Sequence, residues 1–198
     1  MATLYHAPNS RSSVVVSLID ELGADVEIVE VSVPRHDGSG GPDPNNPHPE
    51  KKVPFLVDGG ETVRERGAIM VYLTDKYPEA GLGPLAGEPG RGAYLSWLFY
   101  YQSVMEPVII CRMAGVSHPV IEASLRDEAT MTANLVETLG RQPYLLGERF
   151  SAADLLCSSP FLWLPDLLPE NEAVRDWVAR CGARPSLKRT LERDGIAG

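Results

Sequence analysis

The sequence predicts two domains, an α/β domain followed by an all-α domain. Segments with strand and helix patterns alternate over the first 78 residues, whereas the remainder shows almost only helical spacing of apolar residues. A stretch rich in glycine and proline at residues 79–89 separates the two patterns. We therefore expect domains at residues 1–78 and 90–198, joined by a linker at 79–89.

Composition and charge narrow the class of protein. The 198 residues include 27 acidic and 18 basic side chains, for a net charge of −9, and a chain of this length buries roughly 70% of its unfolded surface. The acidic balance argues against nucleic-acid binding, which needs a concentrated positive face. Because no apolar stretch approaches the ~20 residues of a membrane span and no signal peptide begins the chain, we expect a soluble, cytoplasmic protein that binds neither membrane nor nucleic acid.

The first elements form a βαβ unit. Residues Ala2–His6 have the pattern of a short strand, and a helix begins at Ser12 or Ser13. Its apolar stripe consists of Val15, Leu18, Ile19 and Leu22. Gly23 is typical of a helix end, and Val26–Val33 is a strand that a right-handed crossover places parallel to the first.

An irregular segment and a hairpin follow. Five prolines and three glycines between residues 34 and 50 exclude a regular helix, so this segment is either a lid over a site or a mobile insertion. The runs Val53–Val57 and Thr62–Arg64 flank Asp58, Gly59 and Gly60, which indicates a hairpin. A helix is expected from Glu65 to Tyr77.

The second domain is predicted to be helical throughout. Helical spacing of apolar residues extends over 91–114, 119–139, 152–164, 172–181 and 186–193. Ser151 and Asp154 are spaced as a capping box at the start of one helix, and Phe150 precedes them as a hydrophobic staple toward Leu155.

Four motifs in this order carry a family resemblance. They are LYHAPNSRS (4–12), NPHPEKKVPFL (46–56), ERGAIMVYL (65–73) and FSAAD (150–154). Together they resemble a cytosolic glutathione S-transferase of bacterial, serine type, and the resemblance spans nearly the whole chain. It implies a thioredoxin-like N-terminal domain, an all-helical C-terminal domain, reduced glutathione as co-substrate and a homodimer.

Activation of the glutathione thiol is the central chemical task that the resemblance implies. The thiol has a pKa of about 8.5 and must be ionised to attack an electrophile. A helix N-terminus and a hydroxyl that donates to sulfur both favour the thiolate. The resemblance makes Ser10 the first candidate and Ser12 the second, with Asn9 and Tyr5 as alternatives, whereas either serine could instead be a simple helix cap.

The resemblance also implies residues that bind the glutathione backbone. The bond before Pro54 would be cis and would turn the Val53 backbone toward the cysteinyl residue, although a trans proline on an edge strand is the alternative. Glu65 would face the γ-glutamyl amino group. Arg66 stands where family members usually carry serine; its guanidinium could pair with the ligand carboxylate or point to solvent.

The glycyl carboxylate of glutathione requires a cation. Lys52, Lys51 and His48 are the candidates in this part of the chain. Either lysine could instead be a solvated charge on an edge strand.

The electrophile pocket would lie against the second domain, with Tyr101 and Met105 as its wall, although aromatic and methionine residues at helical spacing are more often core.

No cysteine precedes Cys111, which disfavours disulfide exchange by the protein itself. The four histidines lack metal-ligand spacing, so no metal is expected. The sequence therefore predicts a glutathione transferase acting on hydrophobic electrophiles. Two alternatives remain open: a noncatalytic glutathione-binding or regulatory protein, and a glutathione-dependent reductase, isomerase or peroxidase.

Overall fold

The computed structural model describes residues 1–196, and these divide into two compact units. Unit 1 contains residues 1–80 together with the C-terminal segment from Arg184, and unit 2 contains residues 81–183. The predicted division grouped the C-terminal segment with the helical domain. In the structure this segment packs with unit 1, because its helix lies against the first helix of the chain.

Unit 1 is built on a mixed four-stranded sheet in the order β2-β1-β3-β4. Its strands are β1 (Ala2–His6), β2 (Val26–Glu30), β3 (Phe55–Asp58) and β4 (Glu61–Arg64). Strand β1 pairs in parallel with β2 and antiparallel with β3, which is itself antiparallel to β4. Gly59 and Gly60 both have positive φ at the hairpin turn, a conformation that glycine adopts without steric cost. The predicted βαβ unit and hairpin are confirmed.

Helices α1 and α2 pack with this sheet. They are α1 (Ser13–Leu22) and α2 (Arg66–Lys76), and a short 3₁₀ turn, η1 (Pro78–Ala80), follows α2. Helix α1 ends as predicted at Gly23, which has a φ of 59°. The fully buried core of unit 1 contains Leu4, Leu18, Leu56, Ile69, Met70 and Leu73. These residues have the apolar spacing seen in the sequence, so burial of one face explains why each element forms.

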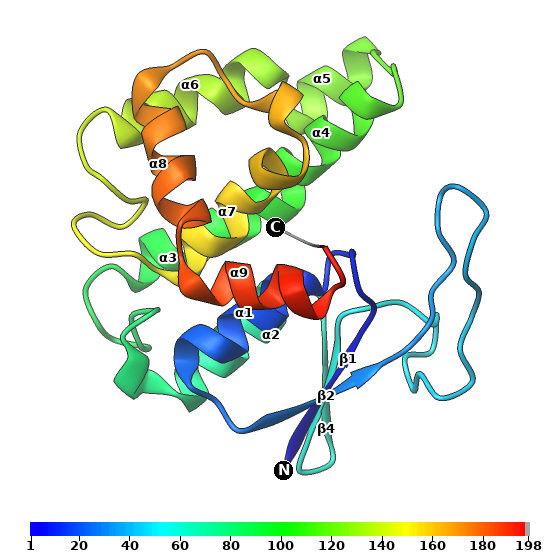
Figure 1. Cartoon of the computed structure of the whole chain (residues 1–198). Coiled ribbons are helices and arrows are strands. Elements are labelled where there is room, and N and C mark those ends of the chain that lie inside the picture. Colours follow the sequence, from blue (N-terminus) through cyan, green and yellow to red (C-terminus); the bar gives the residue numbers. More distant parts are fainter. Residues whose placement is uncertain (197–198) are drawn as a thin grey trace. The chain divides into compact units, whose positions relative to one another are not determined.

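The last helix, α9 (Pro185–Arg193), completes unit 1 by packing on α1, as Figure 1 shows. The buried hydroxyls of Ser17 and Thr190 lie 2.8 Å apart between the two helices. This docking brings the end of α9 to the loop that joins β1 to α1.

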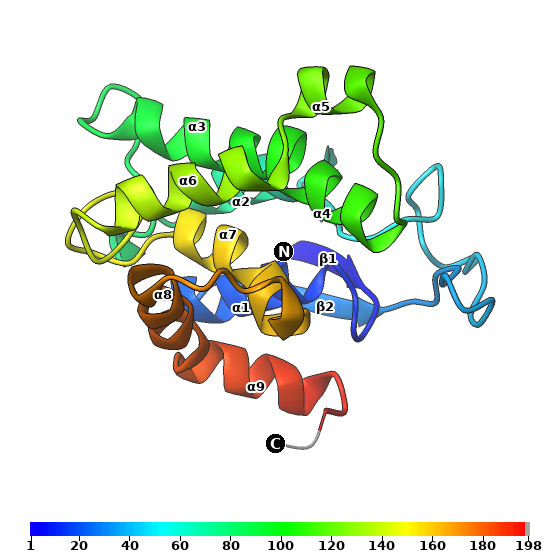
Figure 2. The ribbon, with the colours of Figure 1, turned by 90° about the horizontal axis from the view of Figure 1, so that it is seen from above.

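Residues 34–50 form neither helix nor strand, as the prolines predict, and they project from the end of β2 in both views (Figures 1 and 2). Hydrogen bonds within the segment and to the residues that flank it hold it in place. Asp43 accepts the amide N–H groups of Ser32 and Asn45. The buried Asn46 side chain donates to the carbonyl of Lys52 at 3.1 Å and accepts from the amide of His48 at 3.0 Å.

Unit 2 is helical. Its elements are α3 (Arg91–Tyr100), the π-helical turn η2 (Tyr101–Met105), α4 (Glu106–Met113), α5 (Pro119–Leu125), α6 (Glu128–Leu139), α7 (Ala152–Trp163), the 3₁₀ turn η3 (Pro165–Leu167) and α8 (Glu172–Gly182). The prediction of one helix over 119–139 is wrong. Arg126 has a φ of 81°, and the Asp127 carboxylate caps α6 by accepting from the amide of Thr130, so the chain starts a new helix there.

The predicted capping box is present at the start of α7. The Asp154 carboxylate accepts from the Ser151 amide at 2.9 Å, the Ser151 hydroxyl at 2.7 Å, the Leu145 amide at 2.8 Å and the Trp177 indole at 2.9 Å. Burial raises the pKa of Asp154, and these hydrogen bonds oppose the rise. Asp154 thus joins α7, α8 and the preceding loop.

Within residues 1–196, none of the helices combines the length and the apolar composition that a membrane span requires.

Candidate functional site

The loop between β1 and α1 places a partly exposed hydroxyl at the start of a helix. Ser10 is half-buried, its carbonyl accepts from the Ser13 amide at 3.0 Å, and its Oγ accepts from the Ser12 amide at 3.1 Å. The Oγ atoms of Ser10 and Ser12 lie 2.7 Å apart. Because a helix N-terminus carries partial positive charge, an anion beside Ser10 would be stabilised there.

Ser12 differs from Ser10 because it is fully buried. Its Oγ lies 2.7 Å from Nδ1 of His6 and accepts from the Ala7 amide at 3.1 Å. Although Ser12 is the N-cap residue of α1, its side chain makes no capping hydrogen bond, so it is not a simple helix cap. This hydroxyl also lies 3.3 Å from the Ala7 carbonyl, to which it can donate, and it links β1 to the loop.

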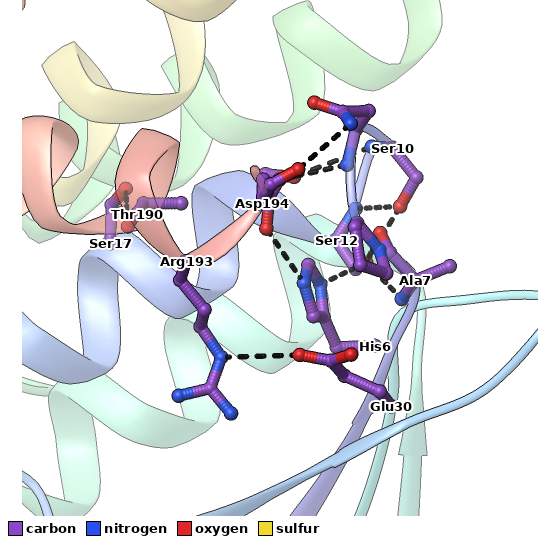
Figure 3. Close-up of polar contacts among 12 residues, drawn as sticks. His6, Ala7, Ser10, Ser12, Ser17, Glu30, Thr190, Arg193 and Asp194 are labelled. Atoms are coloured by element: carbon purple, nitrogen blue, oxygen red, sulfur yellow. Dashed lines mark hydrogen bonds and ion pairs between the residues drawn. The ribbon is translucent and has the colours of Figure 1, made fainter. Parts of the chain in front are cut away.

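A buried carboxylate from the far end of the chain completes this cluster (Figure 3). Oδ1 of Asp194 lies 3.0 Å from Nε2 of His6, while Oδ2 accepts from the Ser13 hydroxyl at 2.5 Å and from the Asn9 amide at 2.8 Å. Burial lowers the pKa of His6, and the nearby Asp194 opposes that change. We define the relay as Ser10, Ser12, His6 and Asp194.

Sequence reasoning did not identify His6 or Asp194 as site residues. A signal for His6 exists, because Ala2, Leu4 and His6 alternate on the buried face of β1, where a polar residue needs a partner. No comparable signal exists for Asp194, which lies 188 residues from His6 in the sequence.

Arg35 holds the other side of the loop. Its guanidinium donates to the carbonyl of Pro8 at 2.6 Å and to the carbonyl of Asn9 at 3.1 Å. Asn9 is exposed and has a φ of 55°, a conformation that asparagine tolerates better than most residues. Tyr5 lies on β1 with its ring centroid 6.3 Å from that of Phe55, so it packs on the sheet.

The resemblance-based expectation for Pro54 is confirmed, because the Val53–Pro54 bond is cis. Val53 is half-buried and Pro54 is buried directly before β3. Since β3 pairs with β1, this backbone belongs to the same sheet that carries the Ser10 loop.

Glu65 and Arg66 begin α2. Glu65 is exposed and has a φ of 68°, a conformation that costs a residue with a side chain about 1–3 kcal/mol. Arg66 is only 5% exposed, so the alternative in which its guanidinium extends into solvent is wrong.

The three candidate cations have different environments. His48 is buried, accepts from the Glu50 amide at 3.0 Å through Nδ1 and lies edge-on to Phe55. Nζ of Lys51 donates to the carbonyl of Asn46 at 2.6 Å. Lys52 is the most exposed of the three.

Tyr101 and Met105 both lie in η2 of unit 2 and are buried, at 4% and 0% exposed. Their predicted role as an electrophile wall stays a prediction. Within residues 1–196, no three or more His, Cys, Asp or Glu side chains are grouped so as to hold a metal ion.

Comparisons with known proteins agree over both units. Residues 4–81 match the glutathione S-transferase N-terminal domain, and residues 100–185 match the C-terminal domain of the same family. The disulfide-bond oxidoreductase YfcG of Escherichia coli is 28% identical over 96% of this chain and 94% of its own length. Glutathione S-transferase F14 of Arabidopsis thaliana is 27% identical over 91% of this chain and 78% of its own length.

Solved structures are similar over the full length. A glutathione transferase from Methylococcus capsulatus has a TM-score of 0.80 and 25% identity, with both chains covered completely. A sphingomonad glutathione S-transferase complexed with glutathione has a TM-score of 0.77 and 26% identity, covering 98% of this chain and 100% of the other.

Proposed function

This chain belongs to the glutathione S-transferase family, and on that premise we propose that it binds reduced glutathione and conjugates it to small hydrophobic electrophiles. The observation that carries the proposal is the half-buried Ser10 hydroxyl at the N-terminus of α1, on a loop held by Arg35 from one side and by Asp194 from the other. A site for a reactive anion needs such a preorganised donor.

The chemistry requires a glutathione thiolate at neutral pH. In this proposal the sulfur lies beside Ser10, whose hydroxyl donates to it, and the amides at the start of α1 supply further positive potential. Comparable positions at helix N-termini bring cysteine pKa values to about 3.5–7.5 from about 8.5. Ser12, being buried, acts through Ser10.

The rest of glutathione would extend along the segment before β3 and the start of α2. The Val53 backbone next to Pro54 would pair with the cysteinyl residue, and the Glu65 carboxylate would bind the γ-glutamyl amino group. The strained φ of Glu65 supports this role, because such strain is retained where a side chain must be held in place. The backbone N–H of Arg66, at the N-terminus of α2, would donate a hydrogen bond to the γ-glutamyl carboxylate.

Lys52 would bind the glycyl carboxylate of glutathione, since it is the most exposed of the three candidate cations. His48 and Lys51 would support the segment from which Lys52 projects. For the electrophile we propose Tyr101 and Met105 as wall residues, and we propose a homodimer, which the resemblance to cytosolic glutathione S-transferases implies.

The test is a titration of the wild-type protein with glutathione that follows the ultraviolet absorbance of the thiolate, combined with turnover of a chloronitrobenzene. We expect thiolate formation and conjugation in the wild type, and a loss of about 10²–10³-fold in kcat/KM in Ser10→Ala. Binding without thiolate or turnover would identify a noncatalytic binding protein. Absence of glutathione binding would refute the proposal.

A second function is favoured by the Escherichia coli relative named as a disulfide-bond oxidoreductase. Since no cysteine precedes Cys111 in the sequence, two glutathione molecules would supply the electrons: two thiols are oxidised to glutathione disulfide while one disulfide substrate is reduced to two thiols. Reduction of bis(2-hydroxyethyl) disulfide without conjugation of the chloronitrobenzene would favour this function over the first.

A further inference from the structure

Three hydrogen bonds connect the half-buried Ser10 to a buried carboxylate through the relay (Figure 3). The distances are 2.7 Å between Oγ of Ser10 and Oγ of Ser12, 2.7 Å from Ser12 to Nδ1 of His6, and 3.0 Å from Nε2 of His6 to Asp194. Ser12 and His6 are fully buried, and Asp194 is 5% exposed. The relay therefore reaches the surface at Ser10 through groups that are otherwise enclosed.

Counting the protons on Asp194, His6 and Ser12 determines which group donates in each hydrogen bond of the relay. The Asp194 carboxylate only accepts, and it already faces donors from Ser13 and Asn9, so Nε2 of His6 carries a proton. In neutral His6 the atom Nδ1 is then an acceptor. The Ser12 hydroxyl has two acceptors for its single proton, Nδ1 of His6 at 2.7 Å and the Ala7 carbonyl at 3.3 Å, and the shorter contact assigns the proton to the bond with His6.

The same count fixes the orientation of Ser10. Ser12 has no second proton, so the short contact between the two hydroxyls requires Ser10 to donate to Ser12. Ser10 Oγ therefore presents a lone pair, not a proton, to an incoming ligand. A serine that only donates to a thiolate would need the opposite orientation.

We propose that His6 takes up the proton of the glutathione thiol through the hydroxyls of Ser10 and Ser12, with Asp194 holding the resulting imidazolium. This inference rests on the proposed function. His6 and Asp194 do not touch glutathione and act through the serines, so they are positioning residues, and Ser10 alone meets the sulfur.

The transfer balances in atoms and charge. The S–H bond breaks and its proton joins Oγ of Ser10, the Ser10 proton moves to Oγ of Ser12, and the Ser12 proton moves to Nδ1 of His6. A neutral thiol and a neutral imidazole become a thiolate and an imidazolium. The hydrogen bonds between Ser10 and Ser12 and between Ser12 and His6 are kept with their directions reversed, the bond from Nε2 of His6 to Asp194 keeps its direction, and Ser10 now donates to the sulfur anion.

The charges around His6 suit this role. Burial lowers the pKa of His6, so the imidazole is neutral before glutathione binds, and the same burial acts against the imidazolium. Asp194 and Glu30 favour the charged form, whereas Arg193 disfavours it. Nε of Arg193 lies 3.9 Å from the Glu30 carboxylate, which offsets part of its charge.

The experiment counts the protons released when glutathione binds. Calorimetry of the whole protein at about pH 7, in buffers of different ionisation enthalpy, measures the protons that enter the buffer, and thiolate absorbance measures ionisation. S-methylglutathione, whose sulfur cannot ionise, provides the baseline for all other groups. The difference between the two ligands isolates the thiol proton.

We expect the wild type to form thiolate with no proton released beyond the baseline, because His6 retains it. Release of one proton per thiolate in the wild type would overturn the relay and leave the proposed function intact. Failure to bind glutathione or to form thiolate would instead refute the proposed function.

Variants separate proton uptake from a structural role. Ser12→Ala interrupts the relay between Ser10 and His6, so we expect at least about tenfold less thiolate at about pH 7 and one proton released for each thiolate that forms. Retention of the proton in Ser12→Ala would overturn the proposal. Ser17→Ala is the matched control, because it removes the hydroxyl contact between α1 and α9 outside the relay and leaves Thr190 bonded to the Ser186 carbonyl. We expect Ser17→Ala to release as many protons as the wild type. The measurement on the wild type tests the proposal even if neither variant folds.

Discussion

Arg184 and Glu21 form a bidentate ion pair within unit 1. Nε of Arg184 lies 2.7 Å from Oε1 of Glu21, and Nη2 lies 2.5 Å from Oε2. The Ser186 hydroxyl donates to the same carboxylate. Because Arg184 precedes α9 and Glu21 lies in α1, this pair fixes the start of α9, and the far end of the helix then delivers Asp194 to the relay.

We predict that Glu21→Gln destabilises the fold by about 1–2 kcal/mol at neutral pH, because the single amide oxygen of Gln can accept only one of the two charge-assisted hydrogen bonds from Arg184 and its NH2 group cannot accept the other. Burial acts to raise the pKa of Glu21, but hydrogen bonds from Arg184 and Ser186 outweigh it and lower the pKa below 4.5. The stabilisation is thus present above the unfolded-state pKa and is lost as pH falls through the lower folded-state pKa.

Urea unfolding at several pH values measures this effect. The difference between Glu21→Gln and the wild type is expected to shrink under acid conditions below pH 4.5. Glu192→Gln, at an exposed position on α9, serves as the control and should change stability by less than about 0.5 kcal/mol. A difference that stays constant into acid would contradict the ion-pair explanation.

Asp154→Ala is expected to destabilise the chain by more than about 4 kcal/mol, because it leaves the amides of Leu145 and Ser151 and the indole N–H of Trp177 without their acceptor. Unfolding followed by tryptophan fluorescence measures the loss. Asp176→Ala, at an exposed position on α8, is the matched control. Equal stability of the two variants would show that the Asp154 cluster contributes little.

Glu65→Gly is predicted to separate stability from binding. Glycine adopts the φ of 68° at no steric cost but is more flexible when unfolded, so we expect stability to be unchanged or higher by up to about 2 kcal/mol. Glutathione affinity should fall at least about tenfold through loss of the carboxylate. Thermal unfolding and calorimetric titration test both parts, and unchanged affinity would exclude Glu65 from the site.

Lys52→Ala is expected to weaken glutathione binding by about two- to fivefold, and the effect should diminish at high salt because exposed charges are screened. Lys188→Ala removes an exposed lysine of α9 and should leave affinity unchanged. Similar effects of the two substitutions would mean that Lys52 acts only through net charge.

Much of the fold follows from local patterns. The stripe of α1, its end at Gly23 and the turn at Gly59 and Gly60 were all predicted, because spacing and backbone freedom act over a few residues. The break at Arg126 escaped prediction, since the apolar spacing continues through it and only the cap formed by Asp127 reveals two helices.

The candidate site was predicted only in part. The family resemblance ranks Ser10 before Ser12, but the residue types alone do not separate them, because both are hydroxyls near the start of a helix. Burial distinguishes them, since Ser12 is enclosed whereas Ser10 reaches the surface. The buried state of Arg66 likewise depends on what surrounds α2, which neighbouring residues in the sequence do not specify.

The sequence by itself determined the family, the order of elements and the absence of any cysteine before Cys111, because these depend on residue types and short-range spacing. The tertiary structure alone decided that α9 belongs to unit 1 and that Asp194 meets His6, 188 residues away. A hydrogen bond requires its two atoms to lie within about 3 Å, and only packing of α9 on α1 brings this carboxylate to that distance from the imidazole.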